Sequence, residues 1–180
     1  MIEKSDRRVL MTKRLLKESL IELLKDKDIY HISIRELCER ADVNRSTFYK
    51  YYGSQFDLLA DMESDMIEFI QKTISKNIES QQRIIEKMCY YLEENIEFAR
   101  LIVNNNIDPT FAQKVFSLEI IKGIVFNSAK HIDEEEFEYV YTFLVSGAFA
   151  EISLWLNKEN RESPKKMGVI IERQIAKLFK

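Results

Sequence analysis

Residues 33–59 read SIRELCERADVNRSTFYKYYGSQFDLL, and this stretch decides how the N-terminal part of the chain folds. Ser33 and Glu36 stand three residues apart just before an apolar run, which is the pattern of a capping box at the start of a helix. From Ile34 to Ala41 the apolar side chains recur at helical spacing, so they can all face one core. A short amphipathic helix is therefore expected from Ile34 to about Ala41.

Residues 42–44 interrupt this pattern. Asn44 is a good N-cap, because its side chain can accept a hydrogen bond from a backbone N–H of the next turn. A second short helix is therefore expected from Arg45 to about Tyr52. Gly53 is expected to end that helix in the left-handed conformation, which glycine adopts without strain.

A first helix is expected ahead of this pair, because leucines recur at helical spacing within residues 8–25. Two short helices joined by a three-residue break, after a longer helix, are the pattern of a helix-turn-helix. If Phe48 and Tyr52 face the core, then Ser46 and Lys50 point furthest outward. The outward face carries donors for DNA phosphates and base edges. The alternative is a helical hairpin whose charged face is exposed to solvent and binds nothing, since it would show the same pattern.

The stretch resembles the signature of TetR-type repressors. The most specific part is Thr-Phe-Tyr-x-Tyr-Tyr from Thr47 to Tyr52, followed by Asp57-Leu58-Leu59. With the first helix, the resemblance covers about residues 8–62. It implies an all-α protein with a DNA-binding domain over residues 1–55 and a helical dimerisation and ligand-binding domain over residues 56–180.

The resemblance also implies roles for individual residues. The positions that typically hold phosphates are Ser33, Arg35, Tyr49 and Tyr51. The positions that typically face base edges are Arg45, Ser46, Thr47 and Lys50. We add Asn44 and Gln55, which stand at the starts of the third and fourth helices, to the expected DNA-binding residues.

Two positions depart from the family pattern. Asp42 stands where the family usually has a glycine in the turn, and aspartate tolerates the left-handed conformation that the turn needs. Gln55 stands where the family usually has a lysine, so the phosphate contact expected there lacks a charge and is weaker or lost.

Composition agrees with a helical protein that binds nucleic acid at one end. The 180 residues include only 4 Gly and 2 Pro, which favours long helices over a β fold rich in turns. The net charge is −3, but residues 1–52 carry 12 basic and 9 acidic side chains, and the remainder carries 15 and 21. A basic module beside an acidic body is typical of a DNA-facing end.

The sequence shows no signal peptide, so a cytoplasmic protein is expected. Cys38 and Cys89 lack the spacing of a metal or redox motif, and we interpret them as buried reduced thiols, with a disulfide between them as the alternative. His31 and His131 have no partner at ligand spacing, so neither a metal site nor another cofactor is expected. No nucleophile, base and orienting group can be assigned together, so the chain is not expected to be an enzyme.

From Val140 to Leu156 the only charge is Glu151. A membrane span is one interpretation of this apolar stretch, but its polar residues disfavour it, and no membrane partner is expected. The preferred interpretation is a helix buried on one side by its own core and on the other by a second copy of the chain. The helix that begins at Pro164 is expected to pack beside it. The expected dimer contacts are Phe143, Gly147, Ala150, Ile171 and Ile175.

A small-molecule pocket is expected in the larger domain. The aromatic candidates for its wall are Phe69, Tyr90, Tyr91, Phe98, Phe116, Phe126 and Trp155. An aromatic at helical spacing is also ordinary in a core, so this assignment and plain packing both remain open.

The function expected from these observations is a homodimeric repressor that binds a palindromic operator in double-stranded DNA. A small molecule of unknown identity would release it. The alternative is a helix-turn-helix interaction protein or co-regulator that acts through a protein partner and senses no small molecule. Activation in place of repression depends on operator position, which the sequence does not give.

Overall fold

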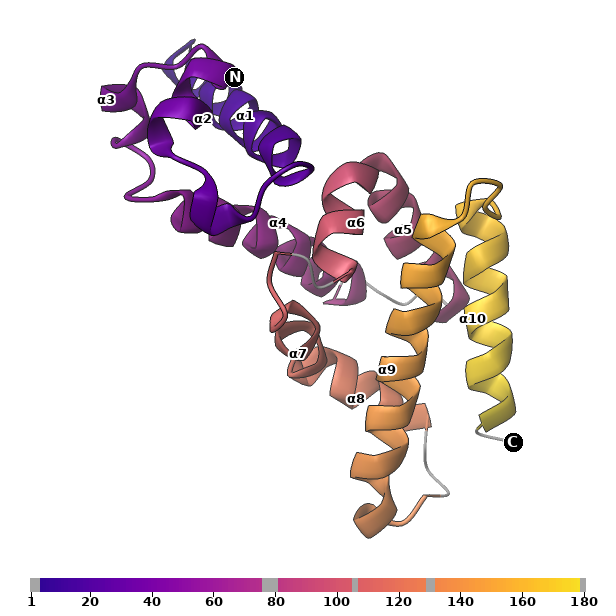
Figure 1. The fold of residues 1–180 in the computed structure, drawn as a ribbon. Helices are drawn as coiled ribbons and strands as arrows, with labels where there is room; N and C mark the ends of the chain where they lie inside the picture. The colour runs from indigo at the N-terminus through magenta and orange to yellow at the C-terminus, as the bar shows by residue number, and fades with distance from the viewer. Residues whose placement is uncertain (1–3, 76–80, 105–106, 129–131, 179–180) are drawn as a thin grey trace. The chain divides into compact units, whose positions relative to one another are not determined.

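The computed structural model describes residues 4–75, 81–104, 107–128 and 132–178. Within these ranges all regular structure is helical, with helices α1 to α10 and one short 3-10 helix, as expected for an all-α fold (Figure 1). The chain divides into two compact units, Met1–Met66 and Ile67–Lys180.

The first unit is a three-helix module closed by the start of a long fourth helix. Its elements are α1 (Lys4–Leu24), a 3-10 turn (Ile29–His31), α2 (Ile34–Ala41), α3 (Arg45–Phe48) and the first turns of α4 (Gln55–Ser75). The fully buried side chains of its core are Leu16, Leu20, Leu37, Phe48 and Leu58. Each of these helices presents one apolar face to that core, as the periodicity predicts.

The turn between α2 and α3 forms as expected. Asp42 lies in the left-handed region, with φ 52° and ψ 42°, and among the described residues it is the one non-glycine residue with positive φ. The Val43 N–H donates to the Cys38 carbonyl at 3.0 Å, which satisfies a carbonyl left free at the end of α2. Aspartate therefore takes the place of the usual glycine without breaking the turn.

The end of the third helix differs from the prediction in two ways. The α-helix ends at Phe48 instead of Tyr52, because the chain tightens into turns in which the Lys50 N–H donates to the Thr47 carbonyl. The left-handed conformation expected for Gly53 is wrong, since no described glycine has positive φ. The Gly53 N–H donates to the Asp57 carboxylate at 2.9 Å, so this contact forms the junction with α4.

The second unit is built from the end of α4 and six further helices. They are α5 (Gln81–Glu94), α6 (Ile96–Val103), α7 (Phe111–Phe116), α8 (Glu119–Ser128), α9 (Glu134–Asn157) and α10 (Pro164–Leu178). The amphipathic patterns of residues 82–105 and 111–130 each predict one helix, and in the structure each of these stretches is divided into two. Asn95 divides the first of them, with a non-helical φ of −112° and its side-chain amide bonded to the Tyr91 carbonyl.

Helix α10 packs closely along α5. At Gly168 a Cβ atom would lie 3.1 Å from the backbone of Glu86, so a larger residue would require the two helices to move apart by a few tenths of an ångström. The hydroxyl of Ser163 accepts a hydrogen bond from the Lys166 N–H at 3.3 Å and caps α10 in front of Pro164, as the sequence predicts.

The division between the units falls inside α4, after Met66, further along than the boundary at residue 55 expected from the motif. A polar cluster explains this position. Lys17 on α1 lies 2.7 Å from Asp61 and 2.6 Å from Asp65 on α4, and the Tyr52 hydroxyl donates to Asp61 at 2.8 Å. The first turns of α4 are therefore part of the N-terminal module.

We expect Asp61→Asn to lower the stability of this module by about 1–2 kcal/mol at neutral pH, since the ion pair with Lys17 is lost. Burial would raise the pKa of Asp61, but Lys17 and Tyr52 outweigh it and hold that pKa below its usual value. The stabilisation from Asp61 is thus present above the unfolded pKa near 3.8 and is lost as the pH falls through the lower folded pKa.

Urea denaturation at pH 7 and at pH 3 measures both effects. Tyr52→Phe is the matched control, because it removes one hydrogen bond from Asp61 and leaves both charges. Equal stability of Asp61→Asn and the unmodified protein at pH 7 would contradict the role assigned to the cluster.

Candidate DNA-binding face and ligand cavity

Side-chain caps position the two short helices of the N-terminal module. The Ser33 hydroxyl accepts a hydrogen bond from the Glu36 N–H at 3.2 Å, as the capping box predicts. The side-chain Oδ1 of Asn44 accepts hydrogen bonds from both the N–H and the hydroxyl of Ser46, each at 2.9 Å. The caps fix the N-terminus of α3, where four backbone N–H groups begin without helical partners.

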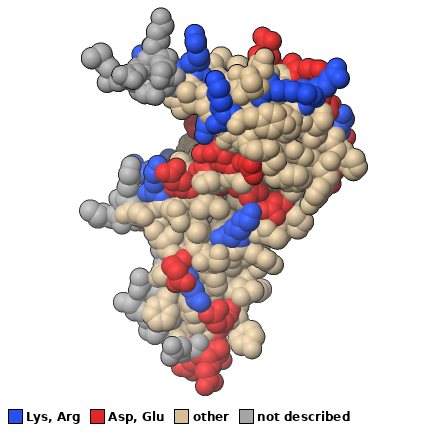
Figure 2. All heavy atoms as spheres, turned by 90° about the vertical axis from the view of Figure 1, so that its left-hand side faces the viewer, with Lys and Arg blue, Asp and Glu red and all other residues tan. Residues whose placement is uncertain are grey.

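The orientation of α3 and the following turn agrees with the predicted phase. Phe48 and Tyr52 are buried, with 0% and 5% of their surface exposed. The exposed positions on the opposite side are Asn44, Arg45, Ser46, Tyr49 and Lys50. Thr47 and Tyr51 are half-buried. On the face that Figure 2 shows, Lys and Arg side chains gather on this module with acidic ones between them.

The cations of this face differ in how far they are already engaged. The Arg35 Nε lies 2.7 Å from the Glu39 carboxylate, so that guanidinium is shared with a neighbour on α2. Within the described part of the chain, Arg45 and Lys50 form no ion pair. Gln55 is half-buried, and its amide donates to the Ile29 carbonyl at 3.4 Å. Arg45 and Lys50 are therefore the cations most available to a ligand such as DNA.

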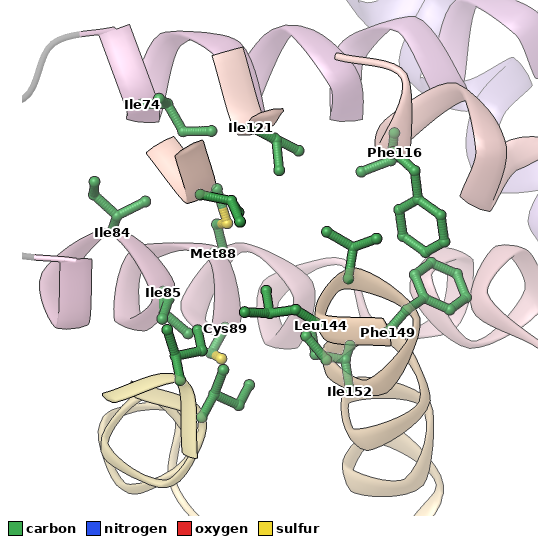
Figure 3. Close-up of a pocket in the computed structure, with 16 residues that line it drawn as sticks. Ile74, Ile84, Ile85, Met88, Cys89, Phe116, Ile121, Leu144, Phe149 and Ile152 are labelled. Carbon is green, nitrogen blue, oxygen red and sulfur yellow. The ribbon is translucent and has the colours of Figure 1, made fainter. Parts of the chain in front are cut away.

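The second unit contains an apolar cavity of about 200 Å³. Sixteen residues line it, and Figure 3 shows their side chains converging from several helices. They come from α4 (Ile74), α5 (Ile84, Ile85, Met88, Cys89), α7 (Val115, Phe116), α8 (Ile121, Val125), α9 (Leu144, Val145, Ala148, Phe149, Ile152) and α10 (Ile171, Ile175). None of these side chains is charged.

Of the seven aromatic residues expected to form the pocket wall, only Phe116 lines this cavity. Tyr90 and Phe126 are exposed, and Phe98 is buried elsewhere in the core. Phe69 and Tyr91 stack on each other, with ring centroids 3.9 Å apart. Trp155 is 1% exposed, and its indole N–H donates to the Glu162 carbonyl at 2.7 Å. The wall is mostly aliphatic, with Phe116 and Phe149 as its aromatic residues. In sequence, its isoleucines look the same as those of an ordinary core.

Both cysteines are buried and free, as expected. Burial raises the pKa of Cys89 to about 12, with Glu86 and Glu93 adding to the effect, so the thiol in the cavity wall is neutral. Burial also raises the pKa of Cys38. Among the described residues no group of His, Cys, Asp and Glu is placed to hold a metal ion. His131 lies outside the described residues.

One side of α9 is apolar and exposed. Phe143 is 68% exposed, and Gly147 and Ala150 are exposed on the same face. Tyr139 and Leu154, which the sequence analysis did not single out, extend this stripe at helical spacing. Of the two expected contacts on α10, Ile175 is half-buried. Ile171 is only 3% exposed, because it packs into the cavity wall of its own protomer and has little surface left for a second copy.

These observations define a helix-turn-helix protein with a second, helical unit that contains an apolar cavity. Comparison with known families agrees with this class. Residues 18–62 match the model of bacterial regulatory proteins of the tetR family, and residues 79–177 match the model of a transcriptional regulator C-terminal region of that family. The chain belongs to the TetR family of transcriptional regulators.

Two relatives are similar in sequence to the chain at low identity. The uncharacterized HTH-type transcriptional regulator YxbF of Bacillus subtilis (strain 168) is 25% identical over 161 residues, 83% of this chain and 41% of that protein. The HTH-type dhaKLM operon transcriptional activator DhaS of Lactococcus lactis subsp. lactis (strain IL1403) is 23% identical over 127 residues, 69% of this chain and 66% of its own. The chain thus spans less than two thirds of either relative.

Solved structures share the fold. A TetR transcriptional regulator from Streptococcus agalactiae 2603V has a TM-score of 0.68 at 21% identity, covering 95% of this chain and 97% of its own. The dihydroxyacetone kinase operon activator DhaS has a TM-score of 0.63 at 20% identity, covering 94% and 97%. The helical architecture therefore extends over both units.

Proposed function

We propose that the protein is a dimeric repressor that binds a palindromic operator and is released from it by a small molecule. The observation that carries the proposal is the recognition face, where Arg45 and Lys50 are exposed over a core sealed by Phe48 and Tyr52 and form no ion pair with any described residue. An arginine and a lysine at these positions suit guanine edges and phosphates. The protein is proposed to act in the cytoplasm, without catalytic activity of its own.

The exposed stripe on α9 supports the dimer. Residues Glu135–Asn157 are apolar and long enough to cross a membrane, yet only 28% of their most apolar window is buried within the protomer. A second copy that covers the stripe would bury this surface without a membrane. Glu151, in a groove between α9 and α10, has one buried carboxylate oxygen without a hydrogen-bond donor among the described residues. A donor from the second copy would satisfy that oxygen.

Helix α4 supports a switch between the cavity and the DNA-binding module. It is continuous from Gln55 to Ser75, so it carries Asp61 of the module's polar cluster and Ile74 of the cavity wall. A ligand that displaces Ile74 would act on the same helix that Asp61 ties to Lys17 and Tyr52. Such a ligand shifts DNA affinity only if it binds the two states of the protein unequally.

The test combines operator selection with sedimentation. Duplexes selected from a random pool are expected to contain an inverted repeat, and the protein bound to them is expected to be dimeric. A selected site without twofold symmetry, bound by one protomer, would contradict the proposal.

Because the Lactococcus relative is named an activator, activation is the second candidate. A reporter gene placed behind the selected operator distinguishes the two by the sign of the change when the protein is expressed.

We expect Gln55→Lys to strengthen operator binding with little change in sequence preference. A lysine at the start of α4 supplies the charge that the family position usually carries, and it should release about one more counterion on binding. Titrations at several salt concentrations measure the slope. Gln55→Met is the control, because it also removes the bond to the Ile29 carbonyl but adds no charge. An unchanged salt slope in Gln55→Lys would show that this position does not face the DNA backbone.

A further inference from the structure

We infer that the effector is a small, uncharged and largely apolar molecule of about six to ten non-hydrogen atoms. The inference rests on the proposed function, because it assigns a chemical class to the ligand of the proposed effector site. It follows from the size of the cavity and from the chemistry of its wall.

Among the described residues, the wall offers nothing to pair with a charge. The sixteen described side chains that line it are apolar, and their only heteroatoms are the sulfur atoms of Met88 and Cys89. Burial keeps the Cys89 thiol protonated at neutral pH, since it raises the pKa of that group to about 12. Burying an ion without a partner costs a large free energy, whereas an apolar molecule gives up no hydrogen bonds when it leaves water. Ionised acids and amines are therefore excluded from this cavity.

Hydrogen bonding restricts the ligand as well. The carbonyl of Phe116 at the end of α7 already accepts a hydrogen bond from the Tyr141 hydroxyl, and a thiol or a thioether in the wall is only a weak partner. A hydroxyl or amide buried here would give up its bonds to water without replacing them. An effector with few or no polar atoms fits the wall best.

The volume sets the size of the ligand. A dry cavity of about 150 Å³ lined by aliphatic and aromatic side chains holds a benzene-sized molecule. The cavity here is about 200 Å³, so a ring with one or two small substituents fits. Phe116 and Phe149 lie edge to face at one end, with centroids 5.6 Å apart. An aromatic ligand can continue this arrangement, and the sulfur atoms of Met88 and Cys89 also contact rings favourably.

The decisive experiment compares three probes of similar size and different charge. Ethylbenzene is neutral, benzoate is an anion and benzylammonium is a cation. Titration calorimetry of the full chain at pH 7 is expected to give a Kd for ethylbenzene lower by at least on the order of 100-fold than for either ion. Saturating ethylbenzene is expected to raise the Tm by several degrees, and the ions are expected to leave it unchanged.

A cavity-filling variant locates the binding. Val115→Trp fills part of the cavity from α7 and is expected to weaken ethylbenzene binding at least about tenfold. Val169→Trp is the matched control, because Val169 is a half-buried residue of α10 outside the cavity wall, and it should bind as the unmodified protein does. If Val115→Trp fails to fold by circular dichroism, Met88→Trp fills the cavity from α5 and replaces it.

The outcomes separate this inference from the proposed function. Binding of benzoate or benzylammonium as tight as that of ethylbenzene would overturn the assigned class, and so would the absence of any binding by ethylbenzene. Operator binding is measured on the same samples. If it is normal in these cases, the DNA-binding part of the proposed function stands although the assigned ligand class is rejected. If ethylbenzene binds as expected and operator affinity does not change, the ligand class is supported and release by this ligand is rejected.

Discussion

Gly147→Leu is expected to convert the proposed dimer into a monomer and to abolish tight operator binding. Gly147 lies at the centre of the exposed stripe on α9, between Phe143 and Ala150. Within the protomer a Cβ at Gly147 would meet nothing within 4 Å, so the leucine has room there. The helix propensity of leucine is more favourable than that of glycine by somewhat less than about 1 kcal/mol, so the protomer itself should not be destabilised.

The cost of this substitution falls on the interface between the two copies. Overpacking at a close contact costs about 1–3 kcal/mol, and a symmetric dimer carries the substitution twice, which gives about 2–6 kcal/mol. The dimer Kd should therefore rise roughly 30-fold or more. Operator affinity should fall with it, because one DNA-binding module alone makes half of the contacts.

Sedimentation equilibrium at micromolar concentration measures the dimer, and mobility shift on the selected operator measures DNA binding. Gly123→Leu is the matched control, since Gly123 lies within α8 and a Cβ there also meets nothing within 4 Å. A Gly147→Leu protein that remains dimeric while binding its operator normally would show that another surface joins the two copies.

The N-terminal module was predictable from sequence because its determinants are local. Ser33 and Asn44 cap the helices that follow them, and the left-handed Asp42 forms the turn between them. Each of these features depends on residues within a few positions along the chain. The error at Gly53 also has a local cause. The side chain of Asp57, four residues further along the chain, accepts the Gly53 N–H that a left-handed turn would have used.

A pocket was expected in the larger domain, but most of the residues that line it were not predictable, because they depend on how six helices meet. Ile84, Ile121 and Ile152 follow the same apolar pattern as the fully packed leucines of the module, and periodicity does not report whether neighbouring helices leave a space. Most of the aromatic residues expected to line the pocket have other roles. Phe69 stacks on Tyr91, and the buried indole of Trp155 donates a hydrogen bond to a backbone carbonyl.

The exposed side of α9 was inferred from composition and not from periodicity. A helix with a single charge over residues 140–156 must be covered on more than one side. Composition does not, however, say which residues of α10 accompany it. Ile171 and Ile175 stand one helical turn apart and both line the cavity, yet Ile171 is buried and Ile175 is half-buried.

Arg45→Ala and Lys50→Ala are each expected to weaken operator binding without unfolding the protein. Both side chains are exposed, and neither forms an ion pair within the described residues, so their removal leaves no buried partner. A contact to a base edge should cost about 1–3 kcal/mol and relax the preference at one operator position. A contact to a phosphate should weaken all sequences alike and lower the salt slope by about one.

Titrations of operator and scrambled duplexes at several salt concentrations separate these two kinds of contact for each variant. Arg40→Ala is the control, because Arg40 is an exposed cation of the same module whose guanidinium lies 2.9 Å from Glu22 on α1. Its loss removes the same charge from the module, so it reports the part of the effect that depends on net charge alone. If Arg45→Ala and Lys50→Ala lose no more affinity than Arg40→Ala, then α3 does not enter the groove by this face, and the phase derived from Phe48 and Tyr52 does not identify the surface that meets DNA.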